Sequence, residues 1–389
     1  EALTEGAGAI TLDNNISVDD VNGSGTGTVG GVYFTGTVEI PGSAALIIDT
    51  EQGDDNDAAP VDFTNATFTV LAGDSSLEID VSAGGGNNGQ DVVLGTIDNS
   101  GGGFLEGLDI NTNATNNLTL NGDILLGNDG DADQASFSFD GDEIILGVAG
   151  SSTVTLSTIG GTGTTAPGAV DLGSADLSAT NANVVLNIDT STDGGYGNVD
   201  GGDVTFGTFS NSGGNYLGRL FVDTTGQSGT NGNISGAAAG SILVDGDGTN
   251  AATSGVELIG TLGLGFDLVI DTNQTDDGRD AGVVDLDQAI VGATAAGVDL
   301  TINTSTGGGG GDAANVTIGD VIDIDGAGVT YQVLQSLTVN TSSGAGTAGT
   351  LNLDDLSGGG TVDINVANHV DFSNATTVVM GEDVSITTT

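Results

Sequence analysis

The chain has 389 residues, of which 70 are glycine, 3 are proline and none is cysteine. Its 54 acidic residues stand against two basic ones, Arg219 and Arg279, so the formal net charge is -52. This charge repels nucleic acid and anionic membranes, and the lack of cysteine excludes disulfides. No apolar run is long enough for a membrane-spanning helix. The partners that such a surface favours are cations, either as diffuse salt or as bound Ca²⁺.

The composition is uniform from end to end, which favours one elongated domain. Glycine, threonine, asparagine, aspartate and valine dominate, lysine is absent, and short apolar strings recur, so we expect an all-β fold. We divide the chain into N-terminal strands or a first coil (1–45), a repetitive region (46–366) and C-terminal strands (367–389).

One motif recurs along the chain: Leu, any residue, Ile or Val, Asp or Asn, then Thr. Looser copies begin at Leu77 and Val154. Within each copy the first and third residues share one face of a strand, and the residue between them points the other way. The full copies lie at 46–50, 108–112, 186–190, 220–224, 268–272, 300–304 and 337–341.

A second motif, Val, any residue, then Leu, Phe or Ile, lies between these copies. The separation from Val61 to Leu77 is the same as that from Val204 to Leu220, whereas the return distance varies and contains the acidic, Gly-rich segments. A constant half beside a variable half is typical of stacked coils, since packed rungs keep register while outward loops change length. The second motif begins at Val61, Val92, Val170, Val204, Val284 and Val316.

This pattern predicts a parallel β-helix (β-solenoid) of roughly ten to twelve coils, with roughly 31 to 37 residues in each coil. Two spacings, from Leu108 to Val154 and from Leu220 to Leu268, are longer than one such coil. We expect an extra strand pair or a long loop there, around 137–146 and 234–258. The alternative, a sandwich of antiparallel hairpins, predicts frequent turn signals but no constant separation between the two motifs.

Two segments carry a family resemblance: GGDVTFGTFSNSGGNYLGRLFVDTT (201–225) and LQSLTVNTSSGAGTAGTLNLDDL (334–356). They resemble the repeats of large Gly-rich bacterial surface proteins of the filamentous-haemagglutinin and autotransporter-passenger kind. The resemblance covers most of 46–366 and is one of style, without a diagnostic motif. It implies a right-handed parallel β-helix, an exported protein at the cell surface, and a role in adhesion or in building a surface layer or filament.

Several short Gly-rich segments offer groups of carboxylates, which are the ligands that Ca²⁺ prefers. None completes an EF-hand loop, and the alternative interpretation is that these residues only stabilise turns. We also expect Asp49 to stack on Asp80, and Asp189 on Asp223, at a corner of the coil, where like charges about 5 Å apart must be screened or bridged. Asparagine at 111, 303 and 340 relieves the same column. The candidate calcium ligands are Asp54, Asp55, Asp57, Asp129, Asp131, Asp133, Asp245, Asp247, Asp276, Asp277, Asp280, Asp323 and Asp325.

The sequence gives little support to catalysis. A β-helix polysaccharide-degrading enzyme is the third alternative for function, but the chain has few of the basic and aromatic residues that such chemistry uses. The one histidine, His369, has no second histidine or cysteine as a metal partner. We therefore expect a protein without enzymatic activity.

Both ends of a solenoid are rows of unpaired backbone groups that invite another chain. The N-terminal segment 9–12 and the C-terminal segments 378–380 and 384–386 are strand-like. We expect copies of this chain to join head to tail, as subunits of an extracellular filament or surface layer. The alternative is an adhesin passenger segment that binds a host or matrix surface.

Overall fold

The computed structural model describes a part of the chain from Ala9 to Thr388. The described residues are 9–18, 31–51, 57–84, 88–127, 134–159, 166–192, 199–209, 215–227, 230–237, 240–245, 255–274, 279–307, 310–322, 325–326, 329–330, 332–354 and 361–388. Side chains are not described for 100, 325–326 and 329–330.

Strands form where apolar residues alternate with polar ones. In β15 (Val185–Asp189), Leu186 and Ile188 are completely buried, and Asn187 between them is only partly buried. Apolar side chains in alternate positions of a strand point to one face, which here is the interior of the coil. The chain passes through three such faces in each coil, always in the order first, second, third.

The first face contains β2 (Ile16–Ser17), β4 (Ala45–Asp49), β6 (Gly73–Asp80), the first parts of β9 (Gly103–Leu120) and β11 (Ser136–Leu146), β13 (Val170–Asp171), β16 (Val204–Phe206), β18 (Asn233–Gly236), the second part of β20 (Gly255–Leu264), β23 (Ala289–Ala293), the first part of β30 (Thr361–Asn374) and β32 (Asp383–Thr388).

The second face contains the first parts of β3 (Val32–Ile40) and β5 (Val61–Val70), β7 (Val92–Leu94), the second parts of β9 and β11, β14 (Asp176–Ala179), β19 (Gly240–Leu243), β21 (Leu268–Asp271), β24 (Asp299–Asn303), β28 (Leu334–Asn340) and the second part of β30.

The third face contains β1 (Ile10–Thr11), the second parts of β3 and β5, β8 (Thr96–Asp98), β10 (Ile124–Leu125), β12 (Thr153–Ser157), β15, β17 (Arg219–Asp223), the first part of β20, β22 (Val283–Leu286), β25 (Val316–Ile318), β29 (Thr350–Leu353) and β31 (Thr377–Met380).

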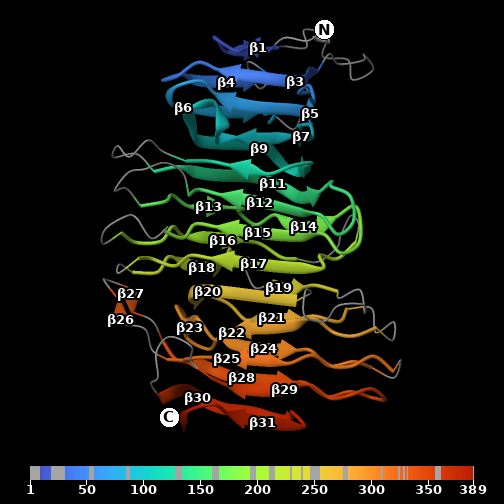
Figure 1. Cartoon of the computed structure of the whole chain (residues 1–389), viewed down its shortest axis with the longest axis vertical. Helices are drawn as coiled ribbons and strands as arrows, with labels where there is room; N and C mark the ends of the chain where they lie inside the picture. The colour runs from blue at the N-terminus through green and yellow to red at the C-terminus, as the bar shows by residue number, and fades with distance from the viewer. Residues whose placement is uncertain are drawn as a thin grey trace.

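Strands of successive coils pair in parallel on all three faces, which confirms the predicted parallel β-solenoid. Figure 1 shows the strands stacked along the longest axis, from β1 near one end to β31 near the other. Outside the three faces lie a 3-10 turn, η1 (Asn99–Gly101), and an antiparallel pair formed by β26 (Asp325–Gly326) and β27 (Val329–Thr330). The number of coils is close to the ten to twelve that the sequence predicts.

The coil is less regular than its sequence motifs. Along the first face, the number of residues from one pairing partner to the next is similar from Leu46 to Val321. The next coil, from Val321 to Ile364, contains more residues, and the last one, from Ile364 to Ile386, contains fewer. The sequence showed only two strand motifs in each coil because one of the three strands of a coil is often too short to form a recognisable motif. In β8 and β10, Ile97 and Ile124 are the apolar residues that point inward.

The interpretation of the two long spacings as an extra strand pair or long loop is wrong. β11 is an ordinary rung under β9, and β18, β19 and the first part of β20 form one ordinary coil. The spacings exceed one coil because the Leu-x-Ile-Asx-Thr motif moves to another face. It lies on the first face at Leu46, Leu77 and Leu108, on the third face at Val154, Leu186 and Leu220, and on the second face at Leu268, Leu300 and Leu337.

The interior is one continuous core of aliphatic side chains with a few aromatic rings. Phe34 stacks on Phe63 of the next coil with ring centroids 5.1 Å apart, and Phe63 contacts Phe68 at the same distance. Each rung is buried by the other faces of its own coil and by the rungs above and below it, so a rung at an end of the stack lacks one of these neighbours.

Candidate functional site

Every full copy of the motif ends in a buried threonine, and in most copies this threonine closes the base of the loop that follows. The hydroxyl of Thr190 donates to the carbonyl of Gly202 at 2.7 Å, and the amide of Gly202 donates back to the carbonyl of Thr190 at 2.9 Å. We call this pair of residues the clasp. The same hydroxyl bond joins Thr50 to Ala59, Thr158 to Gly168, Thr224 to Gly232, Thr272 to Gly282, Thr304 to Ala314 and Thr341 to Gly349.

The second residue of the clasp is small because another backbone lies against it. A Cβ on Gly202 would overlap the carbonyl oxygen of Gly168 in the coil above, and one on Gly349 would overlap that of Ala314. The threonine is equally constrained, since Thr190 has no exposed surface. The clasp therefore fixes where each loop leaves and re-enters the solenoid, and the loop between can change length freely.

The Asp or Asn before each threonine makes an Asx turn at the same corner. Asp223 Oδ1 accepts hydrogen bonds from the amide and the hydroxyl of Thr225, at 2.9 and 2.8 Å. Asn303 makes the same two bonds with Ser305. This arrangement is the usual reason that Asp and Asn are favoured in turns.

These Asx residues stack in register, as predicted. Asp49 pairs with Asp80 and Asp189 with Asp223 in neighbouring coils. Around the first of these pairs, the pKa of the Glu78 carboxyl is raised, first by burial and then by the nearby carboxylates of Asp109, Asp80 and Asp49.

A third Asx column is built differently. Asn303 donates from its side-chain amide to Asp271 at 2.9 Å, and Asn340 donates to Asn303 at 3.1 Å. Each rung of this column is therefore hydrogen-bonded to the next, whereas the Asp columns bring like charges together.

Other carboxylates join one coil to the next. Asp203, just before β16, accepts a hydrogen bond from the amide of Asn233, which begins β18 in the next coil, at 2.7 Å. Such bonds give backbone amides at strand starts, in loops and within strands an acceptor in the neighbouring coil. The other acceptors and donors, at 2.5 to 2.9 Å, are Asp57 and Asn88, Asp91 and Asn117, Asp123 and Thr155, Asp200 and Thr230, Asp267 and Asp299, Asp280 and Asp312, Asp312 and Thr347, Asn315 and Thr350, and Asp320 and Asp363.

Two of the candidate calcium ligands, Asp57 and Asp280, thus bind the amide of the next coil. Asp245 forms an antiparallel bridge with Asn273, which brings the segment that leads to 246–250 beside the one that leads to 275–278. The side chains of the remaining candidates lie outside the described residues: Asp54, Asp55, Asp129, Asp131, Asp133, Asp247, Asp276, Asp277, Asp323 and Asp325.

In the described part of the chain, no group of three or more His, Cys, Asp or Glu side chains is arranged to hold a metal ion. Asn273 is a buried polar residue at the bridge to Asp245: it is 6% exposed, its Nδ2 donates to the carbonyl of Ser305, and its Oδ1 accepts no hydrogen bond. An oxygen in this position is suited to coordinate a cation or to accept a hydrogen bond from a water molecule.

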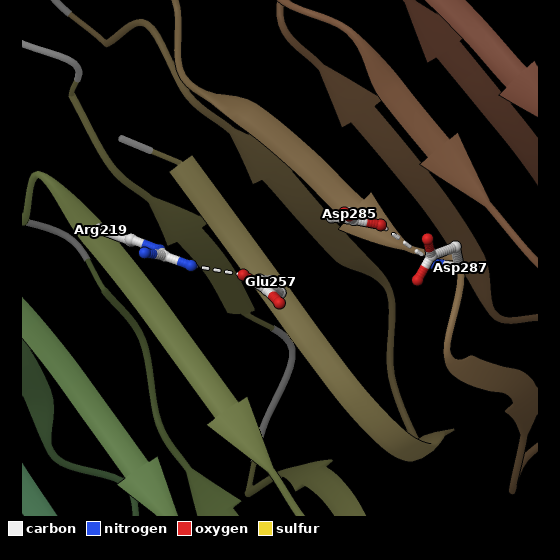
Figure 2. Close-up of polar contacts among 4 residues, drawn as sticks. All are labelled: Arg219, Glu257, Asp285 and Asp287. Carbon is white, nitrogen blue, oxygen red and sulfur yellow. Dashed lines mark hydrogen bonds and ion pairs between the residues drawn. The ribbon is translucent and has the colours of Figure 1, made fainter. Parts of the chain in front are cut away.

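A strip of charged residues runs across the third face at the middle of the solenoid. Figure 2 shows Arg219 on β17 pointing toward Glu257 on the neighbouring strand β20, with Asp285 on the next strand, β22, and Asp287 just after the end of that strand. Arg219 and Glu257 form an ion pair, and the guanidinium lies 5.6 Å from the centre of the Phe221 ring.

Asp287 lies beyond the reach of this arginine. Its amide donates to Asp285 Oδ1 at 3.2 Å. The pKa of the Asp287 carboxyl is raised to about 6, first by burial and then by the charge of Asp285, with smaller contributions from Glu257 and Asp354. A hydrogen bond with Gln288 opposes the shift. Sequence reasoning missed this cluster because its members come from three different coils.

The C-terminal rung, β31 and β32, exposes apolar side chains that point along the interior rows. Val378 and Met380 lie in register with Leu351 and Leu353 of β29, which have no exposed surface. Val378 itself is 38% exposed and Met380 is 62% exposed. On the first face, Ile386 lies in register with a buried residue of β30 and is 47% exposed.

His369 is an exposed residue on β30, in register with Ser336. The pKa of the nearby Asp371 carboxyl is lowered, first by the hydroxyl of Ser373, then by a hydrogen bond from the amide of Ser373, and to a smaller extent by the charge of His369, while burial opposes the shift. These contacts are local ones at the exposed surface of β30.

Among the described residues there is no helix long and apolar enough to cross a membrane. No family model, curated protein or solved structure matches this chain.

Proposed function

We propose that this chain is a non-enzymatic structural protein, a self-assembling subunit of an extracellular filament or surface layer. The observation that supports this most strongly is the exposed C-terminal rung. Val378, Met380 and Ile386 occupy positions that are fully buried in the rung above them, so a further rung would bury them. Removing that apolar surface from water stabilises association.

The carboxylates support the same proposal. They act as acceptors within Asx turns and between coils, as Asp223 and Asp203 do, so their chemistry is used to hold the stack together. An acidic, regularly bonded rod suits a mechanical role at a cell surface, where salt screens its charge.

Electron microscopy and light scattering of the purified chain test the proposal. We expect filaments one solenoid wide, and we expect Met380→Glu to give single short rods because it places a charge on the end surface. Phe266→Glu is the matched control, because Phe266 is 48% exposed but lies away from that end. Monodisperse short rods of the unaltered chain, with calcium and with chelator, would contradict self-assembly.

Calcium stabilisation is part of this proposal. The bridge places the acidic residue Asp245 beside Asn273, whose buried Oδ1 accepts no hydrogen bond from the residues that the structure describes. We expect the thermal unfolding midpoint to rise in CaCl₂ relative to EDTA, and to rise less in MgCl₂ at equal ionic strength, because screening alone would not distinguish the two ions. Equal midpoints in calcium and magnesium would remove calcium from the account.

The alternative is an adhesin whose loops bind a host or matrix surface. It is favoured by the clasps, which hold loops of different length at three corners of the solenoid. Shortening the loop between Thr190 and Gly202, with the clasp kept, tests it by binding to immobilised matrix proteins. A loss of binding with unchanged far-UV circular dichroism would favour adhesion over assembly as the main role.

A further inference from the structure

One interior row of side chains runs the whole length of the solenoid on the third face. It begins with Ile10 of β1 and ends with Met380 of β31. Its members between these ends are Val38, Phe68, Ile97, Ile124, Leu156, Ile188, Val222, Leu258, Leu286, Ile318 and Leu353. All of these are at most 2% exposed, because each has a neighbour on both sides.

Resting on the proposed function, we propose that the partner of the C-terminal rung is the N-terminal rung of a second copy of this chain, in register, so that Ile10 of the second copy continues the row directly after Met380. Met380 is 62% exposed and Ile10 is partly buried, so among the described residues each end of the row lacks one apolar neighbour.

The strands at the two ends lie on matching faces. β1 belongs to the third face, like β31, and β2 belongs to the first face, like β32. The first part of β3 lies on the second face, like the second part of β30. A second copy moved along the axis therefore presents parallel strands beside β31 and β32, each of which pairs with one strand only among the described residues. Parallel pairing is also the arrangement between successive coils.

Charge favours this junction over other contacts between copies. In a chain with a net charge of -52, any contact must limit the repulsion between carboxylates. β1, β2 and β31 contain no acidic residue, and β32 contains only Asp383, at its start. The second part of β30, which also meets the junction, adds one acidic residue, Asp371, so the strands that would meet contain few acidic residues.

Cross-linking tests the register directly, because the chain has no cysteine of its own. Ala9 comes directly before Ile10 in the sequence, and Val379 comes directly before Met380. Both residues are exposed. In the proposed register their Cα atoms would be about 4.8 Å apart, within disulfide range. The two residues are at opposite ends of one copy, so a bond between them must join two copies.

We expect the double variant Ala9→Cys with Val379→Cys to form a ladder of covalent oligomers under mild oxidation, which a reductant reverses. The control is Thr11→Cys with Val379→Cys. It shifts one cysteine by two positions along the same strand, to a Cα separation of about 8 Å, beyond disulfide range. We expect at least a tenfold slower reaction for this control.

The unaltered chain is imaged by electron microscopy in parallel. If the unaltered chain forms filaments but both cysteine pairs cross-link equally, or neither pair cross-links, the proposed register is wrong and the filament proposal still stands. Single rods without cross-linking would overturn both. Efficient dimers from Val379→Cys alone would also contradict the inference, because they require two C-terminal rungs to meet each other.

Discussion

Two regions of the solenoid build the same kind of corner, one at the end of the third face and one at the end of the second, with different electrostatics. In residues 186–224 the Asx column stacks Asp189 on Asp223, and in residues 268–341 it runs from Asp271 through two asparagines that hydrogen-bond to one another. Both columns keep the Asx turn and the clasp. The comparison indicates that the backbone geometry of the corner comes from the clasp and the turn, and that the charge at the Asx position is a separate variable that sets the dependence on salt.

The largest expected effect comes from the part that both regions share. Gly202→Ala and Gly349→Ala each place a Cβ against a carbonyl oxygen of the coil above, so we expect each to lower the free energy of unfolding by about 3 kcal/mol. Urea denaturation measures this. Gly265→Ala is the control, since a Cβ at this position would lie 3.3 Å from its nearest neighbour, the side-chain oxygen of Thr294. A cost below about 1 kcal/mol in either region would show that the clasp does not fix the backbone.

The threonine hydroxyl should matter somewhat less. Thr190→Val and Thr304→Val keep the shape of the side chain but leave the carbonyls of Gly202 and Ala314 without that donor, so we expect a loss of about 1 to 3 kcal/mol in each region. Thr155→Val, on the outer side of β12, is the control and should change stability by less than about 0.5 kcal/mol. If Thr155→Val lowers the free energy of unfolding as much as the other two variants do, the loss comes from the valine side chain and not from the missing hydrogen bond.

Exchanging the Asx residues tests the difference between the regions. Asp189→Asn removes one of two stacked charges, and we expect it to stabilise the chain by about 0.5 kcal/mol at low salt. Asn303→Asp adds a charge above Asp271 and breaks a hydrogen bond, so it should destabilise by about 1 kcal/mol or more. High salt should shrink the first effect and leave part of the second. Salt-independent values for Asp189→Asn would contradict the electrostatic explanation.

The smallest expected effect is the pH dependence contributed by Asp287. Its raised pKa means that the folded chain binds this proton more tightly than the unfolded chain does. The resulting stabilisation is fully present below the ordinary pKa of 3.8 and is lost as pH rises through about 6. Unfolding midpoints from pH 4 to 7 should therefore fall less steeply in Asp287→Asn than in the exposed-loop control Asp13→Asn. Identical slopes would show that Asp287 does not contribute.

The sequence predicted the stacking and its register because the strongest motifs repeat the same inward side chains, and it correctly paired Asp49 with Asp80. It did not show three faces, because strands such as β10 contribute one inward apolar residue and leave no motif. The clasp could have been found, since a threonine ends every full motif and a glycine or alanine stands at the far end of the following loop in most copies. The carboxylates before strands, such as Asp203, were also visible, but their acceptor role depends on which amide lies in the next coil. The exposure of Met380 required the structure.

Mass photometry of the purified chain over a range of concentrations tests the central claim most directly. If the exposed C-terminal rung joins copies end to end, the mass distribution will grow in steps of 37.8 kDa, and Met380→Glu will collapse it to the first step. A single 37.8 kDa species at every concentration, with calcium or with chelator, would contradict the account of this protein as a self-assembling structural subunit.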